Sequence, residues 1–272
     1  MITFIPTPIG NPLDITLRAM RLFEEAELFL CEDTRETKRL MRLLEERYEM
    51  QHPEAEYLSF NEHNGRERLE EVAGRLGSLN VVYVSDAGMP VISDPGQILV
   101  AYCQGKEIGY DVLPGASAVV TAYAASGFEA GKFLFFGFLP HKGIERSRAL
   151  SEALNTGYNT ILYEAPHRLM KLLEEIAAVD PERVLFLGKE LTKKFQTYYK
   201  KPAKALLKSL REVHIRGEWV VVIEAQKNER KALYLEDILA LDLAPKPKAK
   251  LLAKVTGESV KSCYERLVEG RQ

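Results

Sequence analysis

VVYVSDAGMPVISDPG, residues 81–96, joins an apolar run typical of a buried strand to a turn rich in small residues. Two similar turns, PTPIGNP at 6–12 and PGASA at 114–118, also follow apolar runs and precede helical patterns. In open α/β sheets, ligands bind just outside the carboxyl ends of the strands. Because Gly, Ala and Ser let a ligand approach the main chain closely, the three turns together predict a small-molecule site.

The first 118 residues alternate regularly between strand and helix patterns. We expect strands at 2–6, 28–32, 57–60, 81–85 and 110–113, and helices at 15–26, 34–48, 64–77, 95–104 and 116–126. Such alternation predicts a parallel sheet with helices on both faces. Residues 1–118 are therefore expected to form an N-terminal α/β domain.

A second α/β domain is expected over residues 119–227. Its expected strands are 133–139, 160–164, 184–188, 195–199 and 219–225, with helices at 145–155, 167–178 and 203–212. The strands at 184–188 and 195–199 are too close in sequence for a helical crossover, so they should pair antiparallel in a mixed sheet.

The C-terminal part is predicted to be a small helical unit. The polar stretch KNERK, 227–231, resembles a linker, and 234–272 contains three helical patterns. The second pattern begins near a proline and ends at Gly257, which is typical of helix ends. Two helices joined by a short turn match the helix-turn-helix outline. Such a unit either contacts nucleic acid or merely packs, and the outline by itself leaves both possibilities open.

Bulk composition narrows the class of protein. The chain has 272 residues, a net charge of −2 and a pI near 6.3, so any contact with a polyanion needs a local basic patch. Cys31, Cys103 and Cys263 are too far apart for a metal knuckle or a disulfide framework. No run of 18 apolar residues is present. We expect a cytoplasmic enzyme with no metal and no membrane contact.

Several common nucleotide motifs are missing. No two of the 18 glycines are separated by a single residue, which excludes the G-x-G-x-x-G fingerprint of dinucleotide-binding folds. No glycine precedes a Gly-Lys pair at the P-loop spacing, and the G-x-S-x-G elbow is absent. The expected ligand is therefore held by Pro-, Ala-, Gly- and Ser-containing turns.

Eight motifs along the chain carry a family resemblance. They are TPIGNPLDIT (7–16), CEDTRET (31–37), SFNEHN (59–64), SDAGMPVISDPG (85–96), LPGASA (113–118), FGFLP (136–140), YEAPHR (163–168) and KELTKKF (189–195). In this order they closely resemble the ribosomal-RNA-methylating members of the tetrapyrrole methylase family, the class III S-adenosylmethionine methyltransferases. The resemblance covers almost the whole chain.

The resemblance implies two α/β domains with S-adenosylmethionine in the cleft between them. It implies methylation of a cytidine ribose 2′-hydroxyl in the decoding region of small-subunit (16S) ribosomal RNA, within the assembled subunit, by a homodimer. The implied cofactor contacts are Pro8, Ile9, Ala87, Gly88, Met89, Ile92, Ser117, Ala118, Glu164, Leu191 and Trp219. One departure is that many relatives have G-G-D-P where this chain has Ala87-Gly88-Met89-Pro90, so a hydroxyl contact made by that Asp is not expected.

A ribose hydroxyl is a poor nucleophile, so a base or cation should help it lose its proton. Two carboxylate–cation pairs follow strand patterns: Asp33 with Arg35, and Glu190 with Lys189. We take these four residues as candidate catalytic groups. The structural alternatives are a helix N-cap for Asp33 and a partly exposed ion pair for Glu190.

Lysines gather in two places. The stretch 189–208 contains seven lysines against one glutamate, interleaved with Phe195, Tyr198 and Tyr199. A second group lies in the tail. Solvated helix faces explain most lysine runs, but in a slightly acidic chain two clusters favour a phosphate-binding surface. The candidate RNA contacts are Lys193, Lys194, Lys200, Lys201, Lys246, Lys248, Lys250 and Lys254.

Two other functions compete with RNA methylation. One is methylation of a tetrapyrrole or of a protein side chain on the same scaffold. CEDTRET and the lysine clusters argue against it, because a small tetrapyrrole needs neither. The other is a non-catalytic RNA-binding protein, against which the three intact turns argue.

Overall fold

The computed structural model of the protein describes residues 1–129, 131–226 and 235–269. The chain divides into two compact units, Met1–Gln226 and Lys227–Gln272. The linker predicted at 227–231 lies outside the described residues. Among the described helices, none is long and apolar enough to cross a membrane.

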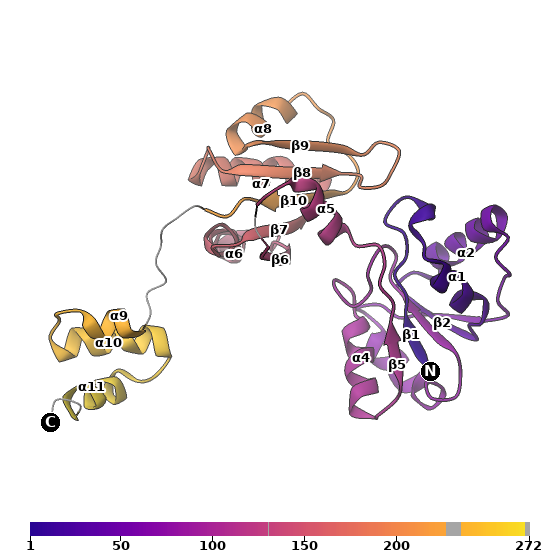
Figure 1. Ribbon diagram of the computed structural model, residues 1–272, viewed down its shortest axis with the longest axis horizontal. Coiled ribbons are helices and arrows are strands. Elements are labelled where there is room, and N and C mark those ends of the chain that lie inside the picture. The colour runs from indigo at the N-terminus through magenta and orange to yellow at the C-terminus, as the bar shows by residue number, and fades with distance from the viewer. Residues whose placement is uncertain (130, 227–234, 270–272) are drawn as a thin grey trace. The chain divides into compact units, whose positions relative to one another are not determined.

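The first five strands form one parallel sheet (Figure 1). They are β1 (Ile2–Phe4), β2 (Leu28–Cys31), β3 (Glu56–Ser59), β4 (Val81–Val84) and β5 (Tyr110–Val112). The helices between them are α1 (Leu17–Glu24), α2 (Thr34–Tyr48), α3 (Gly65–Val72) and α4 (Gly96–Gly105), with 3-10 turns at Pro12–Asp14 and Ala73–Arg75. The spatial order is β3-β2-β4-β1-β5, and every neighbouring pair is parallel.

Both faces of this sheet are covered, because side chains alternate along each buried strand. Leu30 and Tyr83 belong to the apolar core under α3 and α4. Phe29 and Val84, on the other face, belong to the core under α1 and α2. Figure 1 shows α4 on the opposite side of the sheet from α1 and α2. The predicted parallel sheet with helices on both faces is confirmed.

The next five strands form a mixed sheet. They are β6 (Phe133–Phe138), β7 (Asn159–Glu164), β8 (Val184–Lys189), β9 (Thr197–Pro202) and β10 (Trp219–Ile223). The order is β6-β7-β10-β8-β9; β6 and β7 are parallel and the other neighbours are antiparallel. The predicted antiparallel pairing of the strands now labelled β8 and β9 is confirmed.

Four helices pack on the mixed sheet: α5 (Ala118–Ser126), α6 (Gly143–Asn155), α7 (Pro166–Val179) and α8 (Ala203–Leu210). Helices α6, α7 and α8 share one face, where Leu162 and Val221 lie. Helix α5 packs on the other face, against Ile161 and Val220. Residue 118, the predicted end of the first domain, is the first residue of α5. The division of Met1–Gln226 into two domains there stays a prediction.

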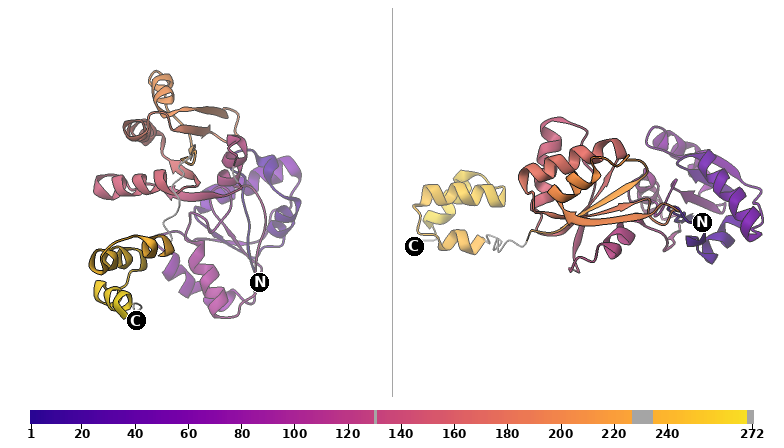
Figure 2. Two further views of the ribbon diagram at one scale, coloured as in Figure 1. Left: turned by 60° about the vertical axis from the view of Figure 1, so that its left-hand side comes forward. Right: turned by 90° about the horizontal axis from the view of Figure 1, so that it is seen from above.

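The described part of the C-terminal unit contains three helices that pack on one another (Figure 2). They are α9 (Leu235–Ala240), α10 (Pro245–Thr256) and α11 (Val260–Glu269). Their small core consists of Ile238, Ala249, Leu252 and Cys263. Helix α10 ends at Gly257, whose φ of +74° is the left-handed conformation of a helix C-cap.

Each strand and helix expected from the sequence is present, with ends that differ by a few residues. The helix predicted at 64–77 ends as α3 at Val72, and glycines at 74 and 77 disfavour its continuation. The strand predicted at 195–199 begins at Thr197. There the preceding turn is closed by the Gln196 side-chain oxygen, which accepts the Thr192 N–H at 2.6 Å.

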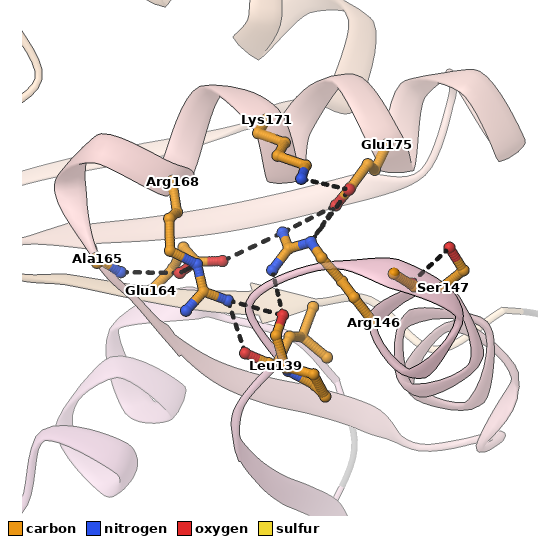
Figure 3. A network of polar contacts seen from close by, with 10 residues as sticks. Leu139, Arg146, Ser147, Glu164, Ala165, Arg168, Lys171 and Glu175 are labelled. Atoms are coloured by element: carbon orange, nitrogen blue, oxygen red, sulfur yellow. Dashed lines mark hydrogen bonds and ion pairs between the residues drawn. The ribbon is translucent and has the colours of Figure 1, made fainter.

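A buried ionic cluster fixes the loop that follows β6 (Figure 3). Arg146 on α6, only 2% exposed, donates to Glu175 at 2.8 Å and lies 3.4 Å from Glu164 at the end of β7. Arg168 on α7 lies 3.1 Å from the same Glu164 carboxylate. Both guanidinium groups also donate to the carbonyl oxygen of Pro140. The cluster therefore joins α6, β7, α7 and the loop at Pro140.

This cluster should be sensitive to loss of one charge, because an unpaired buried charge is strongly destabilising. We expect Arg146→Met to lower the free energy of unfolding by about 3 kcal/mol, measured by urea denaturation. Arg148→Met is the matched control, since Arg148 is exposed on the same helix, and it should change stability by less than about 0.5 kcal/mol. Equal losses in the two variants would contradict this prediction.

Candidate active site

The turns that follow β1 and β4 are joined by main-chain hydrogen bonds. The N–H of Thr7 donates to the carbonyl oxygen of Gly88 at 3.1 Å, and the N–H of Gly88 donates back to Thr7 at 3.0 Å. The Thr7 hydroxyl donates to the carbonyl oxygen of Ser85 at 3.2 Å. Movement of either turn would break these bonds, so the two turns form one fixed wall.

Glycine is needed where the three turns meet. Gly88 has a φ of +84°, a conformation that L side chains rarely adopt, and a Cβ atom there would lie 3.0 Å from Ile9 Cγ2. Gly115 in the third turn packs on Pro6 of the first, where a Cβ atom would lie 2.6 Å from the ring. The close packing of the turns therefore depends on two residues without side chains.

A cavity of about 90 Å³ lies beside these turns and adjoins two open hollows of about 480 and 500 Å³. Each of the two hollows has the size of a typical small-molecule site, roughly 300 to 1,000 Å³. The cavity wall consists of Ile9, Glu32, Ser85, Ala87, Gly88, Met89, Ile92, Ser93, Asp94, Ser117, Ala118 and Tyr163. Three turns of the first sheet thus supply most of this wall, and Tyr163 of β7 contributes to it from the mixed sheet.

Most of the cofactor residues implied by the resemblance come together here. Ile9, Ala87, Gly88, Met89, Ile92, Ser117 and Ala118 line the cavity. Pro8 lines the adjoining hollow of about 500 Å³. Leu191 is buried in the same apolar cluster as Ile9. Their roles in binding stay predictions.

Glu164 and Trp219 are not on the described cavity wall. Tyr163 faces the cavity, so its neighbour Glu164 points to the opposite face of the sheet, where the ionic cluster pairs it. Trp219 packs in the core beneath α6 to α8, whereas Val220 faces α5. The alternation of side chains along a strand explains both placements, and the sequence motifs carried no information on it.

The first turn also contacts the mixed-sheet half of the unit. The N–H of Asn11 donates to the Thr192 hydroxyl at 3.0 Å. Gly10 lies so close to the 191–193 segment that a Cβ atom would be 2.9 Å from the carbonyl oxygen of Leu191. These contacts fix the turn between β1 and α1 against the turn between β8 and β9.

Five cavity residues were missing from the candidates expected from the sequence: Glu32, Ser85, Ser93, Asp94 and Tyr163. Glu32 directly follows β2, and Ser85 directly follows β4. Polar residues that immediately follow a parallel strand lie at its ligand-binding end. That signal was present in the sequence for Glu32 and Ser85, but after the strand pattern at 28–32 only Asp33 was taken as a candidate.

Ser85 carries a buried hydroxyl group on the cavity wall that can bind a ligand. The residue is 6% exposed, and within the residues that the structure describes its Oγ has no hydrogen-bond partner. Buried polar atoms are nearly always paired, so an orphan on a cavity wall indicates a group or water that binds there. The hydroxyl can donate to an oxygen or nitrogen of a small molecule.

Asp94 holds the second turn in a strained conformation. Val91 has a φ of +74°, which is unusual for a β-branched residue. Its N–H donates to Asp94 Oδ2 at 2.7 Å, while Asp94 Oδ1 accepts the Tyr83 hydroxyl at 2.6 Å and the Gly96 N–H at 2.9 Å. One carboxylate therefore fixes the turn that supplies Met89 and Ile92 to the cavity.

Asp33 and Arg35 form the expected pair, in a capping geometry. Asp33 is the N-cap of α2 and accepts the Arg35 N–H at 2.8 Å, and the Arg35 side chain donates to both carboxylate oxygens. These hydrogen bonds from Arg35 lower the pKa of Asp33 to about 2. A carboxylate held so firmly in its ionised form is a weak proton acceptor.

Glu190 pairs with Lys193 rather than with the expected Lys189. Its Oε1 accepts the Glu218 N–H at 2.8 Å and the Lys193 ammonium group at 3.1 Å, while the Lys189 ammonium group lies over the Trp219 ring. Glu190 has a φ of +50°, and this left-handed conformation brings its carboxylate to Lys193 instead of its sequence neighbour Lys189. Burial opposes ionisation, but the two hydrogen bonds prevail and lower the pKa of Glu190.

Glu32 and Asp86 differ from Asp33 and Glu190, because their pKa values are raised rather than lowered. Burial raises the pKa of Glu32, the Asp86 N–H partly offsets this at 3.2 Å, and the charges of Asp86, Asp94 and Glu62 add to the rise. Burial likewise raises the pKa of Asp86. Within the described ranges, no three acidic, His or Cys side chains are grouped as metal ligands.

The lysines expected to bind RNA occupy different surroundings. Lys193 is partly buried in ion pairs with Glu190 and Glu218. Lys194 and Lys201 are exposed, and Lys200 donates to the carbonyl oxygen of Gly127 at 3.1 Å. In the tail, α10 exposes Lys246, Lys250 and Lys254, whereas Lys248 donates to the carbonyl oxygen of Leu239 at 2.9 Å.

Comparison with known proteins identifies the family of this chain. The family model of the tetrapyrrole (corrin/porphyrin) methylases matches residues 1–207. The chain belongs to the tetrapyrrole methylase family. Two relatives are both named ribosomal RNA small subunit methyltransferase I. The one from Campylobacter fetus is 43% identical over 98% of this chain and 100% of its own length. The one from Helicobacter pylori is 42% identical over 99% of each.

A solved structure supports the fold of this tetrapyrrole methylase. Uroporphyrin-III C-methyl transferase from Thermus thermophilus, complexed with S-adenyl homocysteine, matches with a TM-score of 0.55. The match covers 82% of this chain and 96% of that chain at 14% identity. At that identity the likeness concerns the fold alone.

The departure from the G-G-D-P pattern of many tetrapyrrole methylases lies on the cavity wall. Met89 occupies the position of the missing Asp and lines both the cavity and the adjoining hollow of about 480 Å³. Asp94 is nearby, but both its oxygens are engaged within the turn. Met89 therefore makes this part of the wall apolar.

The hydrogen bonds of Asp94 give a stability prediction. Asp94→Ala leaves the Tyr83 hydroxyl unpaired and releases the strained Val91, so we expect the free energy of unfolding to fall by about 2 to 3 kcal/mol. Tyr83→Phe removes only one of these bonds and should cost about 1 kcal/mol. Urea denaturation of both variants tests this, and a smaller loss for Asp94→Ala than for Tyr83→Phe would refute it.

Proposed function

We propose that this protein is an S-adenosylmethionine-dependent methyltransferase of small-subunit ribosomal RNA. Its target is the 2′-hydroxyl of a cytidine in the decoding region of 16S ribosomal RNA. The observation that carries the proposal is the full-length identity of 43% to a ribosomal RNA small subunit methyltransferase I. Matches of the family model alone would leave tetrapyrroles and protein side chains as substrates.

The cavity fits S-adenosylmethionine in its chemistry. Bare main chain at Gly88 and small side chains at Ala87, Ser117 and Ala118 let a flat nucleoside approach closely. The unpaired Ser85 hydroxyl offers a hydrogen bond, and Ile9 with Met89 offers apolar contact. The turns are tied together at Thr7, so the site is largely formed before the ligand binds.

When bound, S-adenosylmethionine supplies an electrophilic methyl group on a sulfonium. The residues of this chain then have to orient the acceptor, exclude water and take up a proton. Orientation alone can account for much of the acceleration. The three fixed turns position the donor side, and Tyr163, whose ring packs against Phe135 at 5.0 Å, forms part of the wall on the mixed-sheet side.

RNA binding is assigned to the lysine-rich surface around β9 and to α10. Lys194 and Lys201 are exposed, and Phe195 and Tyr198 beside them are 70% and 45% exposed. Exposed aromatic rings among lysines suit stacking on unpaired bases with charge contacts to phosphates. We also propose a homodimer in the cytoplasm, acting on the assembled small subunit.

The direct test is transfer of a labelled methyl group from S-adenosylmethionine to isolated small ribosomal subunits, with free 16S ribosomal RNA and a tetrapyrrole as parallel substrates. We expect one methyl group per subunit, located at a ribose 2′-oxygen of a cytidine. Label in the tetrapyrrole would support the rival enzyme. Cofactor binding without any transfer would support a non-catalytic RNA-binding protein.

Cofactor binding should depend on Gly88. Gly88→Ala places a side chain in a positive-φ position 3.0 Å from Ile9 on the cavity wall, so the turn or Ile9 must shift. We expect the Kd for S-adenosylmethionine to rise at least about tenfold, equivalent to about 1.4 kcal/mol, measured by calorimetry. Gly74→Ala is the control, since a Cβ atom there meets nothing within 4 Å. An unchanged Kd for Gly88→Ala would argue against this site.

Charge reversal should separate RNA contacts from unrelated lysines. In Lys194→Glu/Lys201→Glu, we expect weaker binding to the subunit RNA and a salt dependence reduced by about one unit per lost phosphate contact. Lys106→Glu, an exposed lysine at the end of α4, is the control. Fluorescence anisotropy at several salt concentrations measures both, and equal slopes would remove these lysines from the RNA surface.

A further inference from the structure

We propose that Glu32 is the catalytic proton acceptor for the hydroxyl group that this enzyme methylates. The assignment rests on the proposed function, because it requires a hydroxyl acceptor. Glu32 lies outside the two carboxylate–cation pairs expected from the sequence. It differs from the other carboxylates near the cavity in its position and in its hydrogen bonds.

Glu32 has a free oxygen at the cavity. It directly follows β2 and lines the cavity with Ser85, Gly88 and Tyr163. Its Oε2 accepts the Asp86 N–H at 3.2 Å, which fixes the direction of the carboxylate. In the described part of the chain, no donor is hydrogen-bonded to Oε1. That oxygen is available to a hydroxyl group inside the cavity.

Asp86 lines the adjoining hollow rather than the cavity, and its Oδ1 accepts the Asp33 N–H at 3.0 Å. Three further carboxylates are engaged. Both oxygens of Asp33 accept hydrogen bonds from Arg35, and both oxygens of Asp94 are bonded within the second turn. Glu190 is held by the Glu218 N–H and by Lys193. A proton acceptor must reach the reacting hydroxyl directly or through one water. Of the two carboxylates on the described cavity wall, Glu32 and Asp94, only Glu32 keeps an oxygen without a hydrogen bond.

The surroundings of Glu32 also strengthen it as a base. Half-burial and the charges of Asp86, Asp94 and Glu62, which face it from neighbouring segments, raise its pKa above the ordinary value for Glu. A carboxylate with a higher pKa holds a transferred proton better, and catalytic carboxylates are commonly tuned in this direction. Arg35, whose charge lowers the pKa of the neighbouring Asp86, is itself paired with Asp33.

Ser85 is the second polar group at this place. Its buried hydroxyl is unpaired among the described residues and lines the same cavity. The Ser85 hydroxyl can donate a hydrogen bond to the bound ligand. The Glu32 carboxylate on the same cavity wall can accept the proton of the substrate, so the two groups together suit a group transfer. The orphan Oγ thus gives independent support for a ligand next to Glu32.

The step balances without a further reactant. A bond forms between the substrate oxygen and the methyl carbon, and the bond between that carbon and sulfur breaks with its electron pair left on sulfur. The hydroxyl proton moves to Glu32 Oε1 and then to water. The products are the methylated hydroxyl and S-adenosylhomocysteine.

The test compares single-turnover rates of the wild type, Glu32→Gln and the control Glu67→Gln on isolated small subunits. Glu32→Gln keeps an acceptor for the Asp86 N–H but loses basicity, so we expect a loss of about 100-fold or more. Its Kd for S-adenosylmethionine, measured by calorimetry, should stay within about twofold of the wild-type value. Glu67→Gln removes one negative charge from an exposed position on α3, away from the cavity wall, and should keep wild-type activity.

A second readout needs no substrate. Because the folded protein raises the pKa of Glu32, ionisation of this residue opposes folding at pH values above that folded pKa. Glu32→Gln should therefore raise the melting temperature of the ligand-free protein at pH 7. The difference from wild type should shrink as the pH falls through the folded pKa. A Gln variant that melts lower at pH 7 would indicate a structural role and overturn the proposal.

The remaining outcomes are distinguishable. If the wild type transfers no methyl group to any subunit or RNA, the proposed function fails. If the wild type is active and Glu32→Gln retains more than about one tenth of its rate, the assignment of Glu32 fails while the function stands. Asp33→Asn and Glu190→Gln are measured beside it. A larger loss in either of them than in Glu32→Gln would transfer the role to that residue.

Discussion

The pair of main-chain hydrogen bonds between Thr7 and Gly88 is the constraint on which the site depends. It joins the turns after two adjacent parallel strands, so the ends of β1 and β4 act as one rigid surface. Gly88 is required for it, because its positive φ turns the main chain toward Thr7 and leaves room for Ile9. With these turns fixed, the third turn packs through Gly115 on Pro6, and a cavity remains at the strand ends.

The carboxylates around that cavity differ in how they are held by hydrogen bonds. Both oxygens of Asp94 accept hydrogen bonds that fix the second turn, with Val91 in a strained conformation, and Asp33 is fixed by Arg35 at the start of α2. Glu32 differs, because its surroundings oppose ionisation and leave an oxygen free. Strain and unfavourable ionisation both reduce stability, and they are concentrated where a ligand is expected. The buried cluster around Arg146, by contrast, has its charges paired.

Much of this arrangement was predictable. The alternation of apolar runs and helical patterns gave the parallel sheet, and the short spacing between the strands now labelled β8 and β9 gave the antiparallel pair. The three turns identified the strand ends, and most of the residues expected there share one cavity. Ion-pair partners were less predictable. Adjacency suggested Lys189 for Glu190, but the left-handed conformation of Glu190 brings Lys193 to it instead.

The sequence by itself determined the order of elements, the family and the location of the site at the strand ends, because these follow from local periodicity and from short motifs. Tertiary structure alone decided which side chains face the cavity. Tyr163 lines it and Glu164 does not, because neighbouring residues of a strand point to opposite faces and only the packed sheet shows which face is which. The same holds for Glu32 and Asp33: one faces a cavity and the other caps a helix, although the two are adjacent in the chain.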